Sequence, residues 1–197
     1  MKPTYEGFEA RQNAGFIEMP PPGAYIGEIF AVRVVNQGNG DNERPVIELM
    51  IEITEGEYKG RYHQVYEDQK KRFGEDNTSY RGIFRLTPYK EGDSVWRKAA
   101  FEGNLWCVAQ DNPGYAWDWD ETKLKGKKVG FSVQRRLYTY NGKDKEALQI
   151  ARFETIADIK AGKVNPMPDK DQREKHEETP AASGGYTDVT KDTSVPW

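Results

Sequence analysis

The stretch Val46-Ile47-Glu48-Leu49-Met50-Ile51-Glu52-Ile53 decides the fold. From Ile47 onward, every second residue is a branched aliphatic one. Because successive side chains of a β-strand point to opposite faces, this alternation predicts a strand with one face on a core and the other toward solvent. The sequence that follows, Glu55-Gly56-Glu57-Tyr58-Lys59-Gly60, is typical of a tight connection to a further strand.

Four other segments have the composition of β-strands. The first, residues 24–35, is rich in β-branched and aromatic residues, and residues 61–67 directly follow the tight connection. Residues 127–137 and 146–156 form the last two, and they flank Asn141-Gly142, a dipeptide favoured in two-residue hairpin turns. The sequence therefore predicts three strands, then a region of different character, then a hairpin.

The region between the third and fourth strands contains a predicted helix at residues 94–110. Asp93 or Ser94 can cap its N-terminus, and its apolar residues fall roughly on one face. We expect three tryptophans in or near it to pack in the core, namely Trp96, Trp106 and Trp117. The order of three strands, a helix and two strands is that of an OB-fold, a five-stranded β-barrel with a helix between strands three and four.

Composition shifts divide the chain into three parts. Residues 1–22 form an N-terminal arm that ends in three prolines, and residues 23–160 form the predicted barrel domain. Residues 161–197 lack apolar periodicity and are expected to be a flexible, mildly acidic tail.

The composition excludes several classes of protein. There is no apolar run near the roughly 18 residues that a membrane span needs, and the N-terminus lacks the apolar stretch of a signal peptide. One cysteine and two histidines exclude an internal disulfide and make no zinc site, so a reduced, cytoplasmic protein without a metal or cofactor is expected.

The net charge is −3, and its distribution matters more than its sum. The residues from 166 onward hold seven acids and four bases, so residues 1–165 are formally neutral. A neutral domain can still carry a basic groove, because binding depends on local charge.

Several short motifs resemble those of phage-encoded OB-fold single-stranded DNA-binding proteins. They are Pro22-Gly23-Ala24-Tyr25, residues 51–61 (IEITEGEYKGR) and residues 124–130 (LKGKKVG). The resemblance spans residues 20–160 or so, and these motifs are turns and strand starts. It implies sequence-independent binding of single-stranded DNA in phage replication or recombination, in the cytoplasm of the bacterial host.

The C-terminal tip, Val195-Pro196-Trp197, is similar to the apolar tip of the acidic tail in bacterial and phage single-stranded DNA-binding proteins. This resemblance implies that the tail recruits replication or recombination proteins. The tail departs from the pattern because it is only weakly acidic and carries Lys191.

Binding a single strand requires cations along a groove and exposed aromatic faces on which bases stack. Three places combine these features. The first is the run after the third predicted strand, with candidates Tyr66, Lys70, Lys71, Arg72 and Phe73. The second is the predicted hairpin, where strand parity puts three candidates on one face and Lys143 follows the turn; the three are Arg136, Tyr138 and Tyr140.

The third place is more dispersed: Arg33 on the first strand, Tyr62 on the third and Arg85. Tyr62 and Tyr66 share a face of a strand, so either both line the cleft or both lie in the core.

Two alternatives stay open. A protein-interaction or virion-associated β-domain would use the exposed tyrosines to contact another protein and have no DNA affinity, and the neutral charge of residues 1–165 favours it. A metal-dependent nuclease would use Asp118 and Asp120, but the sequence offers no second acidic cluster at a suitable spacing. No phosphate-binding glycine loop or hydrolase motif occurs, so we expect no enzymatic activity.

Overall fold

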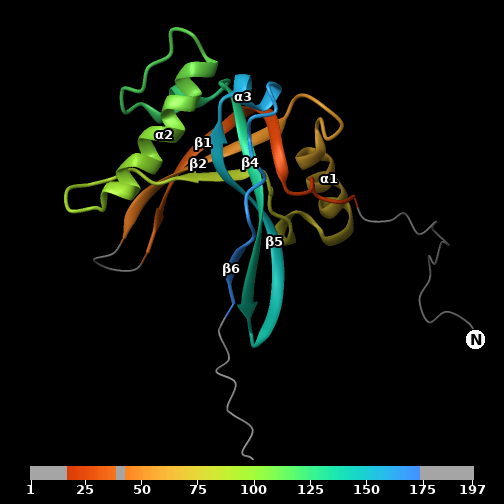
Figure 1. The fold of residues 1–197 in the computed structure, drawn as a ribbon. Helices are drawn as coiled ribbons and strands as arrows, with labels where there is room; N and C mark the ends of the chain where they lie inside the picture. The colour runs from red at the N-terminus through yellow and green to blue at the C-terminus, as the bar shows by residue number, and fades with distance from the viewer. Residues whose placement is uncertain (1–16, 39–42, 174–197) are drawn as a thin grey trace, which may run out of the picture.

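The computed structural model describes residues 17–38 and 43–173 (Figure 1). The elements follow in the order β1 (Gly23–Gln37), β2 (Arg44–Ile53), α1 (Arg61–Phe73), β3 (Ile83–Leu86), α2 (Val95–Asp111), β4 (Lys128–Tyr140), β5 (Lys143–Glu154), α3 (Ile156–Lys160) and β6 (Lys170–Gln172), with short 3₁₀ turns at Glu75–Asn77 and Glu121–Leu124.

The strands form one mixed sheet, so the prediction of a mainly β protein is confirmed. Their order is β3-β2-β1-β4-β5, with every neighbouring pair antiparallel, and β6 pairs with β4 in parallel. The two ends of this order come together through Phe84 of β3 and Phe153 of β5, whose ring centroids are 4.5 Å apart. Among the described strands no hydrogen-bonded ladder joins β3 to β5, so the sheet is open along that seam.

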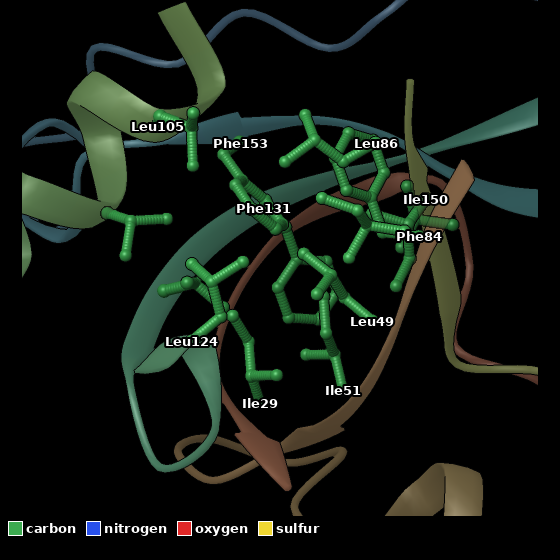
Figure 2. Close-up of a cluster of buried hydrophobic side chains, with 14 of the residues drawn as sticks. Ile29, Leu49, Ile51, Phe84, Leu86, Leu105, Leu124, Phe131, Ile150 and Phe153 are labelled. Carbon is green, nitrogen blue, oxygen red and sulfur yellow. The ribbon is translucent and has the colours of Figure 1, made fainter. Parts of the chain in front are cut away.

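The core lies inside the curve of this sheet (Figure 2). The alternating aliphatic residues of β2 lie there as the sequence predicts, and Leu49 and Ile51 are fully buried. Phe131 of β4 and Phe153 of β5 meet them from the other side, while Leu105 closes the cluster from α2.

The prediction of a third strand at residues 61–67 is wrong, because these residues begin helix α1. Tyr62 and Val65 are both buried, a spacing of three that fits a helix turn. Glu52 at the end of β2 caps the helix: its carboxylate accepts hydrogen bonds from the backbone N–H of Tyr62 at 3.2 Å and of His63 at 2.7 Å. A carboxylate at this position also interacts favourably with the helix dipole.

The third strand of the sheet is instead the four-residue β3, within a segment whose sequence has no clear strand pattern. Gly82 immediately before it leaves no room for a side chain, because a Cβ there would lie 2.4 Å from the carbonyl oxygen of Ile51 and 2.8 Å from the Tyr62 ring. This close approach seats α1 against the junction of β2 and β3.

Helix α2 is confirmed close to its predicted bounds. Ser94 caps it by accepting a hydrogen bond from the backbone N–H of Arg97 at 3.4 Å. The expectation that its tryptophans pack in the core is wrong for two of them, since Trp96 is 82% and Trp106 is 56% exposed. Trp117 is partly buried and packs against the core as expected.

The expected tail also contains structure. Residues 161–169 return along the sheet, and β6 pairs with β4 over Lys170–Gln172. The side chain of Gln134 on β4 donates a hydrogen bond to the carbonyl oxygen of Pro168 at 2.6 Å, which fixes this returning segment. The rest of the expected tail, and all of the N-terminal arm before residue 17, lie outside the described residues.

Candidate nucleic-acid interface

The β4–β5 hairpin projects from the body of the molecule with β6 beside it (Figure 1). Strand β1 pairs with β4 only over Lys128–Val133, and β6 takes the same edge farther along, over Arg136–Tyr138. The hairpin turns at Asn141 and Gly142, both at positive φ (51° and 67°), which confirms the predicted turn. We call this three-stranded extension of β4, β5 and β6 the arm, as distinct from the N-terminal arm of residues 1–22.

The two faces of the arm have different charges. Residues paired across neighbouring strands point to the same face, and the register pairs Tyr138 with Lys145, Tyr140 with Lys143 and Arg136 with Lys170. One face, which we call the basic face, therefore carries Arg136, Tyr138, Tyr140, Lys143, Lys145 and Lys170.

The reverse face carries the acids of the arm, and nearby arginines pair with them. Arg173 lies 2.6 Å from Asp171 and 3.9 Å from Asp144, and Arg135 lies 3.8 Å from Glu146. The register places the three carboxylates beside Leu137 and Thr139, away from the basic face. Cations and tyrosines thus share one side of the arm without an acid among them.

Two cation–π contacts organise the basic face. The guanidinium of Arg136 lies over the ring of Tyr138, 4.9 Å from its centroid, and the ammonium of Lys145 lies 5.1 Å from the centroid of the Tyr140 ring. The Nε of Arg136 is buried and makes no hydrogen bond with any described residue. Tyr140 is 57% exposed, so one face of its ring is open to a flat partner.

A groove runs between the arm and α1. Its lining combines residues of the Glu18–Pro22 segment, Gln69 of α1, Arg81 and the arm residues Arg135, Tyr138, Glu146, Ala147 and Leu148, so two carboxylates, Glu18 and Glu146, also line it. Tyr138 therefore lies where the basic face meets the groove, and Arg81 adds an exposed cation on the opposite wall.

The predicted cations after residue 69 occupy the last turn of α1, where they also interact favourably with the helix dipole. Lys70 pairs with Glu75 at 3.0 Å, and Arg72 pairs with Asp68 at 2.8 Å. Lys71 is exposed, and Phe73 is 53% exposed at the end of the helix. These residues begin one position after Gln69, so this end of α1 borders the groove.

Arg33 and Arg85 share one carboxylate across three strands. Glu48 of β2 is buried between them, and its oxygens lie 2.6 Å from the Arg33 guanidinium and 2.8 Å from that of Arg85. Burial acts to raise the pKa of Glu48, but the hydrogen bonds and charges of the two arginines outweigh it and lower the pKa. Both arginine side chains stay about half exposed, at 55% and 53%. Because the two arginines share one carboxylate, the three side chains together carry one net positive charge.

Tyr62 is not part of any surface. Its side chain is 1% exposed, so its assignment as a nucleic-acid contact is wrong. The strand parity used for Tyr62 and Tyr66 does not apply, because both lie on a helix. Tyr66 is half-buried and lines a second hollow beside β1 and β2, together with Phe30, Arg33, Met50, His63 and Tyr80.

Lys145 and Lys170 complete the basic face but are missing from the residues predicted from the sequence. The position of Lys145 on the basic face can be predicted from the sequence, by continuing the alternation of β4 through the Asn141-Gly142 turn into β5. Nothing in the sequence predicts that Lys170 returns to β4. The tail residues Val195, Pro196 and Trp197 lie outside the described residues.

The acidic loop proposed for a nuclease is occupied by local contacts. Asp118 pairs with Lys123, and Asp120 caps a 3₁₀ turn by accepting a hydrogen bond from the Thr122 backbone N–H at 3.1 Å. Within residues 17–38 and 43–173, no group of three or more acidic, histidine or cysteine side chains is placed to hold a metal ion.

None of the helices in the described part of the chain is both long and apolar enough to cross a membrane. In comparisons with known proteins, no protein-family model matches the chain, and no curated protein sequence matches it either.

Proposed function

We propose that this protein binds single-stranded DNA without sequence preference and without catalysis, and that it acts in phage replication or recombination in the host cytoplasm. The observation that carries the proposal is the basic face of the arm. Four cations and two tyrosines share that face, and the acids of the arm lie on its reverse. Base stacking on aromatic side chains contributes about 1–3 kcal/mol per base, and backbone phosphates bind the neighbouring cations.

The strand order supports an OB-fold as the scaffold. An OB-fold is a five-stranded, partly open barrel in which the first strand pairs with the second and fourth. Here β1 pairs with β2 and β4, α2 lies between the third and fourth strands, and the Phe84–Phe153 contact brings β3 toward β5. In an OB-fold the loop between strands four and five forms one wall of the binding cleft, and the arm contains the corresponding connection between β4 and β5, which supports the proposal.

The test is fluorescence anisotropy of a labelled oligo-dT of about 30 nucleotides, long enough for more than one OB-fold site. The titration is made at about 50 mM and about 200 mM salt, and repeated with duplex DNA of the same length. Four phosphate contacts predict a slope of about −3 in log affinity against log salt, because single strands lose roughly 0.7 per contact. Tight, salt-sensitive binding of the single strand alone supports the proposal.

Absence of binding at low salt contradicts the proposal. In that case a protein-interaction domain becomes the better explanation, since the neutral charge of residues 1–165 and the exposed tyrosines also suit a protein partner.

A further inference from the structure

Helix α2 exposes an apolar face that the fold does not use. Trp96 is 82% exposed and Trp106 is 56% exposed, and Ala99 and Gly103 between them are also exposed. A Cβ on Gly103 would meet nothing within 4 Å. In Figure 1 this helix lies at the margin of the molecule, away from the arm. The face is therefore free for a partner even when the arm is occupied.

The four residues have the spacing of a coiled-coil seam. Trp96, Ala99, Gly103 and Trp106 follow one another at intervals of three, four and three residues, which are positions a, d, a and d of a heptad repeat. The inward face of the same helix is separate and is formed by Phe101, Leu105 and Val108. α2 thus has one seam for its own core and a second seam without a partner in the described structure.

The second seam is self-complementary. Trp96 and Trp106 lie the same number of residues before and after Phe101, and so do Ala99 and Gly103. We propose that it binds a second copy of the same helix, antiparallel, around a two-fold axis near Phe101. A two-fold interface requires this kind of pattern, because each surface must fit itself.

The pattern sets the contacts in such a pair. Trp96 of each copy packs on Trp106 of the other at the two ends, and Ala99 faces Gly103 of the other copy near the axis. The small residues at the centre let the backbones approach, and the tryptophans fill the gaps at the ends. Large aromatic residues of this kind contribute most of the energy at protein interfaces.

The charges on one flank, those of Lys98 and Glu102, cancel within each copy. Lys98 and Glu102 are about half exposed, at 54% and 53%, and within one copy their charged groups are 3.8 Å apart. In the antiparallel pair, Lys98 of each copy lies about 3 Å along the axis from the level of Glu102 of the other. The two lysines then compensate the two glutamates, which approach each other near the axis.

The first experiment measures the mass of the full chain by sedimentation equilibrium over a range of concentrations. We expect a reversible dimer. Gly103→Lys should weaken dimerisation at least tenfold without lowering the thermal midpoint of a dilute monomer, because the added side chain meets nothing in the monomer. The control Gln64→Lys adds the same charge at an exposed position of α1 and should leave dimerisation unchanged.

The second experiment tests the antiparallel geometry by oxidation to a disulfide. The two Ala100 residues lie next to the axis, so Ala100→Cys should form a crosslinked dimer. The two Gln110 residues lie about 27 Å apart along the axis, so Gln110→Cys should not. The native Cys107 gives little background, because its thiol is half-buried 3.7 Å from the Phe153 carbonyl oxygen, and burial raises its pKa to about 11.

Two results would overturn this inference. One is a chain that stays monomeric at every concentration, and the other is a dimer that crosslinks through Gln110→Cys or is unaffected by Gly103→Lys. Neither result bears on DNA binding by the arm, because that is measured separately with the oligonucleotide.

Discussion

The guanidinium of Arg136 lies 4.9 Å from the centroid of the Tyr138 ring, two residues farther along β4. The pair shares a face because alternate residues of a strand point the same way. In the proposed complex a base stacks on the far side of the tyrosine ring and the cation contacts the adjoining phosphate. This is the local arrangement that single-strand binding uses, and it makes the two tyrosines of β4 the first residues to test.

Replacing both tyrosines, Tyr138→Ala with Tyr140→Ala, should weaken oligo-dT binding at least tenfold, because two stacking surfaces of about 1–3 kcal/mol each are lost. The thermal midpoint should change little, since neither ring is fully buried. Fluorescence anisotropy and a thermal melt check the two parts. The matched control is Tyr138→Phe with Tyr140→Phe, which keeps both rings and should retain binding. Unfolding of the alanine variant would mean that the rings support the arm instead.

Removing two lysines of the basic face, Lys143→Gln with Lys145→Gln, should flatten the salt dependence. Two fewer phosphate contacts reduce the magnitude of the slope by about 1.4 for a single strand. The control is Lys59→Gln with Lys163→Gln, which removes the same charge from exposed positions outside the arm. An equal effect of the two double variants would indicate that only net charge matters, and the basic face would lose its special role.

Tyr62→Ala should destabilise the protein by about 3–5 kcal/mol, the usual cost of deleting a buried aromatic side chain. Its ring is 1% exposed and packs against Gly82, so the loss leaves a cavity under α1. Urea denaturation measures the change. At a temperature where the variant is still folded, its DNA affinity should equal that of the wild type, since Tyr62 reaches no surface.

Glu52→Ala should lower stability by about 1–3 kcal/mol, because the backbone N–H groups of Tyr62 and His63 lose the carboxylate that accepts from them. The loss should appear as reduced helicity in far-ultraviolet circular dichroism together with a lower urea midpoint. Glu57→Ala removes an exposed carboxylate from the same connection and should change neither quantity. If both variants behave alike, Glu52 does not cap α1.

Glu48 should make stability depend on pH. Its pKa is lower in the folded protein than in the unfolded chain, so its contribution is complete above about pH 4.3, the ordinary glutamate value, and is lost as the pH falls through the folded pKa. Glu48→Gln should therefore be less stable than the wild type at pH 7. The difference in stability between the two proteins should become smaller toward pH 3. Urea midpoints of both proteins at the two pH values measure this. A gap that stays constant would show that the two arginines do not hold the carboxylate charged.

Much of the fold could be predicted because its signals are local. The alternation in β2 and the Asn141-Gly142 turn each depend on a few adjacent residues, and both predictions are confirmed. α1 could not be assigned in this way. Its first residues suit a strand as well as a helix, and the capping carboxylate of Glu52 comes from another element. β3 is only four residues long, which is too short for a clear pattern.

The candidate site was predictable to a similar degree. Arg136, Tyr138 and Tyr140 share a face through the parity of one strand, and the register agrees with that assignment. The alternation of β5 already separates Lys143 and Lys145 from Asp144 and Glu146, but the placement of Lys170 and Asp171 could not be foreseen, because it depends on β6. That strand has no apolar residue, and it is held by Gln134 and by pairing with β4. Polar segments whose partners are distant in sequence give no periodic signal.

The third strand of the arm also bears on conformational entropy. An isolated two-stranded hairpin is marginally stable in water, and a ligand that binds one must first restrict its motion. β6 pairs with β4 opposite Arg136, Leu137 and Tyr138, so the backbone that carries Arg136 and Tyr138 is already fixed before a ligand arrives. The entropic cost of ordering this part of the arm is therefore met when the chain folds.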